Sequence, residues 1–168
     1  MTVELRKLSP DDGEDVYNLL QEIPADENGF ENTCYGLSYD EYKKWLVQND
    51  NIANGIDLEP WMVPQNIYWL YVDGSPVGVG KLRHRLTPKL EQEGGHCGVC
   101  IVASQRNKGY GKLLSEYIVK EANTLGIEKL LLTIRNDNTA SIQTAKQSGG
   151  IVEKVTDDLH YIWIKTRA

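Results

Sequence analysis

Apolar residues follow two different periods in the first part of the chain. Over residues 2–7 they alternate with polar residues, which is typical of a half-buried strand. The next apolar positions recur at the spacing of one helix face, and these positions are Val16, Leu19, Leu20 and Ile23. Ser9 as N-cap, Pro10 at the first helical position and Asp12 after them predict that this helix begins at residue 10.

A second helix and a hairpin follow from local signals. Ser38 with Glu41 three residues later has the spacing of a capping box, so a helix is expected to begin there. Residues 24–37, between the two helices, read as a polar loop. Further on, alternating segments over 67–72 and 77–86 flank Asp73-Gly74, which predicts an antiparallel hairpin.

The remaining pattern alternates strands with helices. In order, it predicts a strand ending at Val102, a helix over 112–125, a strand over 129–134, a helix over 139–148, and strands over 151–155 and 160–165. The whole chain therefore reads β-α-α-β-β-β-α-β-α-β-β. This order predicts an α/β (α+β) fold, with a mixed, mostly antiparallel seven-stranded sheet covered by helices on both faces.

Composition narrows the class of protein. With 168 residues, 40% of them hydrophobic, and no internal repeat, the chain is expected to form a single domain over 1–168. No apolar run is long enough for a membrane span, and the N-terminus has no signal-peptide pattern, so a cytoplasmic protein is expected. Three cysteines, Cys34, Cys97 and Cys100, argue against a disulfide framework and indicate a reducing compartment.

The net charge of −6 disfavours nucleic acid as a partner and is compatible with a cationic substrate. No metal site is expected either. The pair Cys97 and Cys100 would point to opposite faces of a strand, and zinc needs four converging ligands.

The segment from Ile101 to Leu114 carries the strongest functional signal. An apolar strand end is followed by a basic turn with two glycines, Gly109 and Gly111, and then by a helix. Glycines let the backbone adopt unusual dihedral angles, and the first amides of a helix bind anions, so this order predicts a phosphate or pyrophosphate cradle. The segment lacks the glycine spacing of a Walker loop and of a dinucleotide fingerprint.

The hexapeptide from Arg106 to Gly111 has the form R-x-x-G-x-G and resembles the acyl-CoA pyrophosphate loop of the GNAT acetyltransferase superfamily. The segment after residue 134 is similar to the same family, through Asn138, Ala140, Ser141, Ile142 and Gly149. Three further stretches, around Arg83-His84-Arg85-Leu86, Gly94-Gly95-His96 and Ser148-Gly149-Gly150, resemble a bacterial branch of predicted acetyltransferases. With these, the resemblance spans nearly the whole chain.

The resemblance implies acetyl-CoA as cosubstrate and a sheet that opens between its fourth and fifth strands to hold the pantetheine arm. Backbone groups of Ile101 and Ala103 would then pair with the arm, and the Asn138 side chain would contact the pantetheine or its thioester end. The pyrophosphate would lie on the basic loop and the helix start, formed by Arg106, Asn107, Lys108, Gly109, Tyr110, Gly111 and Lys112.

Two departures from the family pattern affect the chemistry. Ala145 stands where the family often has a catalytic tyrosine, and Gly150 stands where a phenylalanine is usual. His96 is a candidate base or substrate-orienting residue, with a structural role at the strand end as the alternative. Tyr161, Tyr110 or water could protonate the thiolate, and Glu93 and Glu22 are lesser candidates for base or amine recognition.

The sequence therefore predicts an N-acetyltransferase that moves an acetyl group directly from acetyl-CoA to an amine in a ternary complex. The amine could be a small molecule or a peptide, no membrane partner is expected, and a homodimer is possible. The alternative is a module that binds acyl-CoA as a sensor or regulator without turnover, which the absence of the usual tyrosine suggests.

Overall fold

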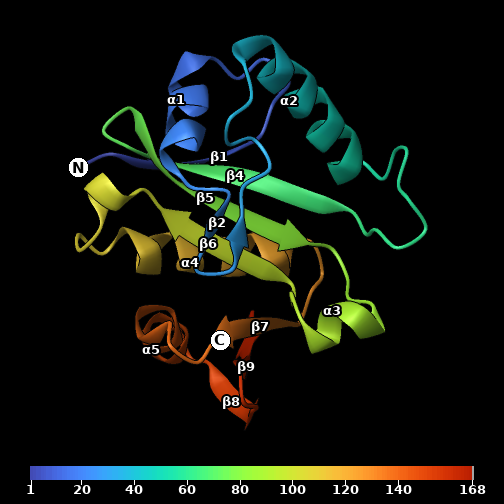
Figure 1. The fold of residues 1–168 in the computed structure, drawn as a ribbon. Helices are drawn as coiled ribbons and strands as arrows, with labels where there is room; N and C mark the ends of the chain where they lie inside the picture. Colours follow the sequence, from blue (N-terminus) through green and yellow to red (C-terminus); the bar gives the residue numbers. More distant parts are fainter. Residues whose placement is uncertain (168) are drawn as a thin grey trace.

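The structure, a computed structural model that describes residues 1–167, contains two main antiparallel sheets with helices on both sides, and a separate two-stranded hairpin (Figure 1). The larger sheet has the order β1-β4-β5-β6, and the smaller has the order β7-β9-β8. Their strands are β1 (Val3–Lys7), β4 (Gln65–Val72), β5 (Ser75–Arg83), β6 (Cys97–Ile101), β7 (Lys129–Arg135), β8 (Ile151–Val155) and β9 (Leu159–Lys165). The predicted opening between the fourth and fifth of these strands is the boundary between the two sheets.

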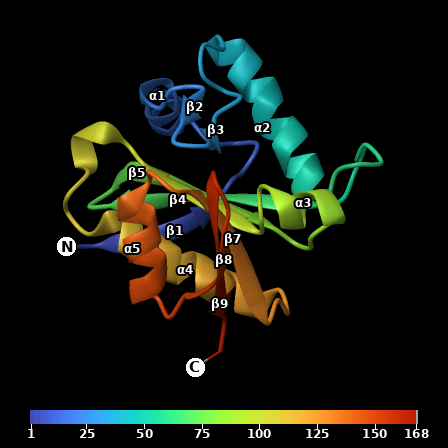
Figure 2. The ribbon, with the colours of Figure 1, turned by 60° about the horizontal axis from the view of Figure 1, so that its bottom comes forward.

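Helices cover the sheets from both sides, as Figures 1 and 2 show together. The helices α1 (Glu14–Glu22) and α2 (Tyr39–Ala53) pack on one face of the larger sheet, and α4 (Tyr110–Thr124) packs on the other. The helix α5 (Thr139–Gln147) contacts α4 and β9, and the short α3 (Pro88–Gln92) links β5 to β6. This α+β architecture agrees with the predicted fold class.

Two apolar cores explain the layers. Trp69 and Val79 face α1 and α2, while Leu82 and Leu114 belong to the core that α4 shares with both sheets. Gly80 of β5 lets α4 approach closely, because a Cβ there would lie 2.8 Å from the Ile118 side chain. The opposite faces of the larger sheet are therefore both buried.

Several local signals are confirmed. Ser38 and Glu41 form the complete capping box of α2. Asp73 and Gly74, with φ angles of 50° and 83°, make the tight turn between β4 and β5. By contrast, the expected start of the first helix is wrong: α1 begins at Glu14 after Gly13. Ser9 and Asp12 instead form a separate turn, in which the Ser9 N–H donates to the Asp12 carboxylate at 2.9 Å.

The segment 24–37 is more ordered than a polar loop. It contains a small hairpin of β2 (Asp26–Glu27) and β3 (Phe30–Glu31), with the left-handed residues Asn28 and Gly29 at its tip. Other boundaries differ by a few residues: β5 ends at Arg83 rather than 86, and α4 begins at Tyr110 rather than 112. Among residues 1–167, no helix combines the length and apolar character that crossing a bilayer requires.

Candidate functional site

The turn between β6 and α4 is shaped by two left-handed residues. After β6 ends at Ile101, a short 3₁₀ turn (Ala103–Gln105) leads into the loop. Asn107 has φ = 64°, and Gly109, the N-cap of α4, has φ = 82°. The first amides of a helix have no acceptor within it, so those of Tyr110, Gly111 and Lys112 can bind an anion at this end of α4.

The same turn lies directly against the end of β6. A Cβ on Gly111 would be 3.9 Å from Cγ1 of Ile101, so the first turn of α4 faces the last residue of the strand. Lys108 and Lys112 are exposed beside it, and the Lys108 amine donates to the Gln105 side chain at 3.0 Å. Amides at a helix start together with flexible cations are the donors that a pyrophosphate requires, so the predicted cradle fits this group.

The outer edge of β6 offers main-chain groups to a ligand. Val102 donates its N–H to Val77 O of β5 at 3.0 Å. Since successive peptide groups along a strand point to opposite edges, the N–H and C=O of Ile101 point away from β5, toward β7. The Ile101 carbonyl accepts from Nε of Arg106 at 3.0 Å. Ala103, at the start of the 3₁₀ turn, accepts from the Arg106 N–H at 3.4 Å.

The two sheets meet at one short junction. His96 donates its N–H to Leu131 O at 2.8 Å, and Leu131 donates its own N–H to Nδ1 of His96 at 2.9 Å. Gly94 donates to Oγ1 of Thr133 at 2.9 Å. Within residues 1–167, no other main-chain hydrogen bond connects β6 or its leading segment to β7. Beyond the junction the strands belong to separate sheets, which creates a wedge between β6 and β7.

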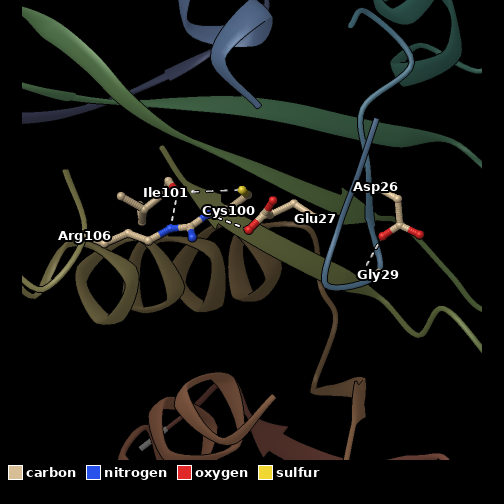
Figure 3. Close-up of polar contacts among 6 residues, drawn as sticks. All are labelled: Asp26, Glu27, Gly29, Cys100, Ile101 and Arg106. Atoms are coloured by element: carbon tan, nitrogen blue, oxygen red, sulfur yellow. Dashed lines mark hydrogen bonds and ion pairs between the residues drawn. The ribbon is translucent and has the colours of Figure 1, made fainter. Parts of the chain in front are cut away.

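The β2–β3 hairpin lies on the α1 and α2 side of this wedge (Figures 1 and 2). At its tip, the Glu27 carboxylate is 3.0 Å from the guanidinium of Arg106 (Figure 3). The neighbouring Asp26 carboxylate is 3.5 Å from the guanidinium of Arg135, at the end of β7. The hairpin therefore connects to both sides of the wedge through its acidic residues.

Contacts of β3 hold the hairpin against the larger sheet. The Lys81 amine of β5 donates to Glu31 O and lies 4.8 Å from the ring centre of Phe30. Burial lowers the pKa of Lys81 to about 8. Phe30 itself covers Gly98 of β6, where an added Cβ would lie 3.6 Å from its ring. The hairpin is thus packed against the strand that carries the wedge edge.

A pocket of about 490 Å³ opens at the far end of β7. Its lining comes from the end of α3, the end of β7 and the turn between β8 and β9, and consists of Glu93, Arg135, Asn136, Asp137, Asp157, Asp158 and Leu159. Four carboxylates against one guanidinium give this pocket a negative charge, which favours a cation. Within the described residues, no three His, Cys, Asp or Glu side chains gather closely enough to hold a metal ion.

Comparison with known proteins identifies the family. A family model described as "Acetyltransferase (GNAT) family" matches residues 21–149, which is more than half of the chain. The chain belongs to the GNAT acetyltransferase family. No curated protein sequence matches it.

Solved structures share the fold at low sequence identity. A GNAT-family acetyltransferase from Streptococcus pneumoniae is 16% identical with a TM-score of 0.67, over 98% of this chain and 99% of that one. YncA, a putative acetyltransferase from Salmonella typhimurium solved with acetyl-CoA, is 15% identical with a TM-score of 0.64, over 100% and 96%. The N-acetyltransferase PseH from Campylobacter jejuni, in complex with acetyl-CoA, is 13% identical with a TM-score of 0.65, over 99% and 100%.

In this GNAT protein, the expected catalytic residues lie near the junction of the sheets. His96 is buried, and burial together with the charge of Arg83 lowers its pKa to about 4. Tyr161 of β9 is opposite Thr133 of β7, and its hydroxyl donates to Gln92 O at the end of α3. The assignments of base and acid to these two residues stay predictions.

One of the residues expected to contact the pantetheine, Asn138, lies on the other side of the wedge, at the start of α5. Asn138 is the N-cap of α5, and its Oδ1 accepts from the Ser141 N–H at 3.4 Å. The cap uses one lone pair of Oδ1, so the Nδ2 amide group remains available to donate to a ligand. Ala145 is buried in α5, and its carbonyl accepts from the Gly150 N–H at 2.9 Å. A Cβ on Gly150 would lie 2.5 Å from that carbonyl, so the bulky residue usual in the family does not fit this turn.

The residues that sequence reasoning missed are those of the hairpin and its partners, Asp26, Glu27 and Arg135. One signal could have found them: Asn28-Gly29 is the pair that a type I′ hairpin turn favours, and Asp26 accepts from the Gly29 N–H at 2.8 Å across it. The pairing of Glu27 with Arg106, 79 residues away, has no local signal.

Proposed function

We propose that this protein transfers the acetyl group of acetyl-CoA to an amine, directly and in a ternary complex. The observation that carries the proposal is the position of the anion cradle, formed by the start of α4, at the outer end of a wedge between two parted sheets. A ligand with a pyrophosphate at one end and an extended amide-containing arm matches this combination of helix start and strand edge.

The chain would hold acetyl-CoA through main-chain groups and a few side chains. Amides from residues 107–112 would bind the pyrophosphate, with Arg106 and Lys108 adding positive charge. The edge groups of Ile101 and Ala103 would pair with the pantetheine arm, and Nδ2 of Asn138 would donate to its far end. When bound, the cosubstrate supplies an acetyl group already activated as a thioester.

The acceptor amine would approach from the side of the β2–β3 hairpin and the acidic pocket. Glu93, which the sequence suggests for amine recognition, lines this pocket together with Asp137, Asp157 and Asp158. A protonated amine is attracted by these carboxylates and must lose its proton before it attacks. We therefore favour a cationic small molecule or peptide amine as the acceptor, which agrees with the net charge of −6.

The test is thiol release from acetyl-CoA, measured against a panel of amines, with calorimetry of CoA binding beside it. We expect release that depends on an amine, and CoA binding that weakens at least about tenfold in Gly111→Val, because a branched side chain there blocks the approach to the amides. A folded Gly111→Val protein with unchanged CoA affinity would contradict the cradle.

A second candidate function is a module that binds acyl-CoA without turnover. It is favoured by Ala145, which has no hydroxyl to protonate a leaving thiolate at the position where the family often has one. The same experiment separates the two functions. CoA binding with no thiol release for any amine of the panel would support the binding module.

A further inference from the structure

Most hydrogen bonds at the junction between the two sheets involve His96. Its carbonyl accepts from the Arg83 N–H of β5 at 2.7 Å, and its N–H donates to Leu131 O of β7 at 2.8 Å. The two main-chain groups of this one residue therefore bind strands on opposite sides. In this way His96 connects the larger sheet to the smaller one at the point where the wedge begins.

The Leu131 N–H would donate to a main-chain carbonyl in a continuous sheet. The His96 carbonyl already accepts from the Arg83 N–H. The imidazole accepts from Leu131 in place of that carbonyl, with Nδ1 2.9 Å from the Leu131 nitrogen. Since an amide N–H only donates, Nδ1 must carry a lone pair. The ring is therefore neutral, with its proton on Nε2.

The surroundings keep the imidazole in this state. His96 is 6% exposed, and the guanidinium of Arg83 lies beside its segment, donating to Gly95 O at 3.0 Å. Both burial and this positive charge disfavour a second proton on the ring and lower its pKa to about 4. At neutral pH the ring therefore stays neutral, and Nδ1 remains able to accept from Leu131.

A glycine makes the close approach possible. Gly95 has φ = 61°, and a Cβ on it would lie 2.4 Å from Leu131 O. Any larger residue would push β7 away from His96. The junction is thus fixed by a missing side chain at Gly95 and a hydrogen-bonding side chain at His96.

We propose that His96 is a positioning residue, whose imidazole replaces a main-chain carbonyl at the start of the wedge and so fixes how β6 and β7 part around the pantetheine arm. A side chain reaches farther from its strand than a carbonyl does, so main-chain pairing stops at His96 and the edge of β6 beyond it is left for a ligand. Because its one lone pair is bound to Leu131, this ring is not the general base. The inference rests on the proposed use of acetyl-CoA.

Two variants of His96 separate this role from catalysis. His96→Asn keeps an acceptor close to the place of Nδ1, whereas His96→Leu keeps the volume and removes the acceptor. We expect His96→Asn to hold the Kd for CoA and the KM for acetyl-CoA within about threefold of wild type, with kcat retained within about tenfold. We expect His96→Leu to raise both Kd and KM at least about tenfold. His84→Leu is the control, since His84 directly follows β5 and its ring binds the Asn66 side chain of β4 at 2.8 Å, outside the junction.

Opposite results would overturn the proposal. A loss of kcat of about 10²-fold or more in His96→Asn, with unchanged Kd and KM, would assign His96 to proton transfer instead. Wild-type CoA affinity in a folded His96→Leu protein would show that the wedge does not depend on the imidazole. If His96→Leu fails to fold, Gly95→Ala replaces it, because the added methyl group crowds Leu131 O and should move β7 away from the imidazole.

A further measurement needs no activity and therefore stands even if no acceptor amine is found. Nitrogen NMR of the imidazole ring in the wild-type protein identifies its tautomer directly. We expect a protonated Nε2 and an unprotonated Nδ1 between pH 6 and 8. A proton on Nδ1, or titration of the ring near neutrality, would overturn the assignment, whereas absent CoA binding with the expected tautomer would count against the proposed function alone.

Discussion

The guanidinium of Arg106 lies between the carbonyl oxygen of Ile101 and the carboxylate of Glu27, at 3.0 Å from each (Figure 3). One contact is to the strand edge where the pantetheine arm would pair, and the other is to the β2–β3 hairpin. Arg106 is also the first residue of the glycine-containing loop. A single side chain therefore connects the predicted cradle, the edge of β6 and the β2–β3 hairpin.

Removing the negative charge of Glu27 should strengthen CoA binding. We expect Glu27→Gln to lower the Kd for CoA about threefold, which corresponds to the 0.2–1 kcal/mol of a partly exposed ion pair. The reason is that Arg106 no longer has to break its ion pair with Glu27 in order to bind the pyrophosphate of CoA. Calorimetry at low and high salt measures the effect, which should shrink at high salt.

Glu4→Gln is the matched control for this prediction, since Glu4 forms an equivalent 3.0 Å pair with Arg6 on β1, away from the wedge. An unchanged Kd in Glu27→Gln, or an equal change in both variants, would contradict a link between the hairpin and the cradle.

Replacing Gly109 should weaken CoA binding in addition to lowering stability. Gly109 and Gly126 both have φ = 82° and no atom within 4 Å of an added Cβ. Alanine at either position should therefore lower the free energy of unfolding by about 1 kcal/mol. Only Gly109→Ala should weaken CoA binding, by about tenfold, because it turns the amides at the start of α4. Equal CoA affinities in the two variants would contradict the cradle.

Stability should fall in acid partly because of His96. Its pKa is lowered from 6.5 in the unfolded chain to about 4 in the folded protein, by burial and by Arg83. Between these values the unfolded chain binds the proton more readily, so this contribution is complete above about pH 6.5 and is lost as the pH falls toward 4. The loss amounts to about 3 kcal/mol.

The free energy of unfolding in urea is measured at pH 7 and pH 4.5 for the wild type and for His96→Asn. Both proteins contain the same carboxylates, so the difference between them isolates the contribution of His96. We expect the wild type to lose more stability than the variant. Equal losses would show that His96 has the same proton affinity in the folded and unfolded states.

Tyr161→Phe should affect stability more than turnover. The hydroxyl of Tyr161 donates to Gln92 O, and its loss should lower the free energy of unfolding by about 1 kcal/mol while kcat stays within about threefold. Tyr17→Phe is a control for stability, because Tyr17 donates in the same way to Leu37 O at 2.6 Å. A fall in kcat of about 10²-fold in Tyr161→Phe alone would instead identify Tyr161 as the acid that protonates the thiolate.

Local patterns in the sequence determined most of the fold. The capping box of Ser38 and Glu41, the Asp73-Gly74 turn and the strand–glycine loop–helix order at 101–114 each depend on residues a few positions apart. Hydrophobic periodicity adds the elements between them, and their order specifies the layers. The expected start of α1 is wrong because Ser9 and Asp12 form a turn through the kind of bond that also occurs at a helix N-terminus.

Only the tertiary structure decided what the candidate site residues contact. Nothing near residue 96 in the sequence indicates that its imidazole accepts from Leu131, 35 positions later, and nothing near Glu27 indicates Arg106. These contacts arise because packing of separate elements brings the groups together, and burial then fixes the charge of the imidazole. The sequence thus determined the elements and the strand–loop–helix order of the predicted cradle, whereas the junction at His96, the contacts of the hairpin across the wedge and the acidic pocket depend on how the two sheets meet.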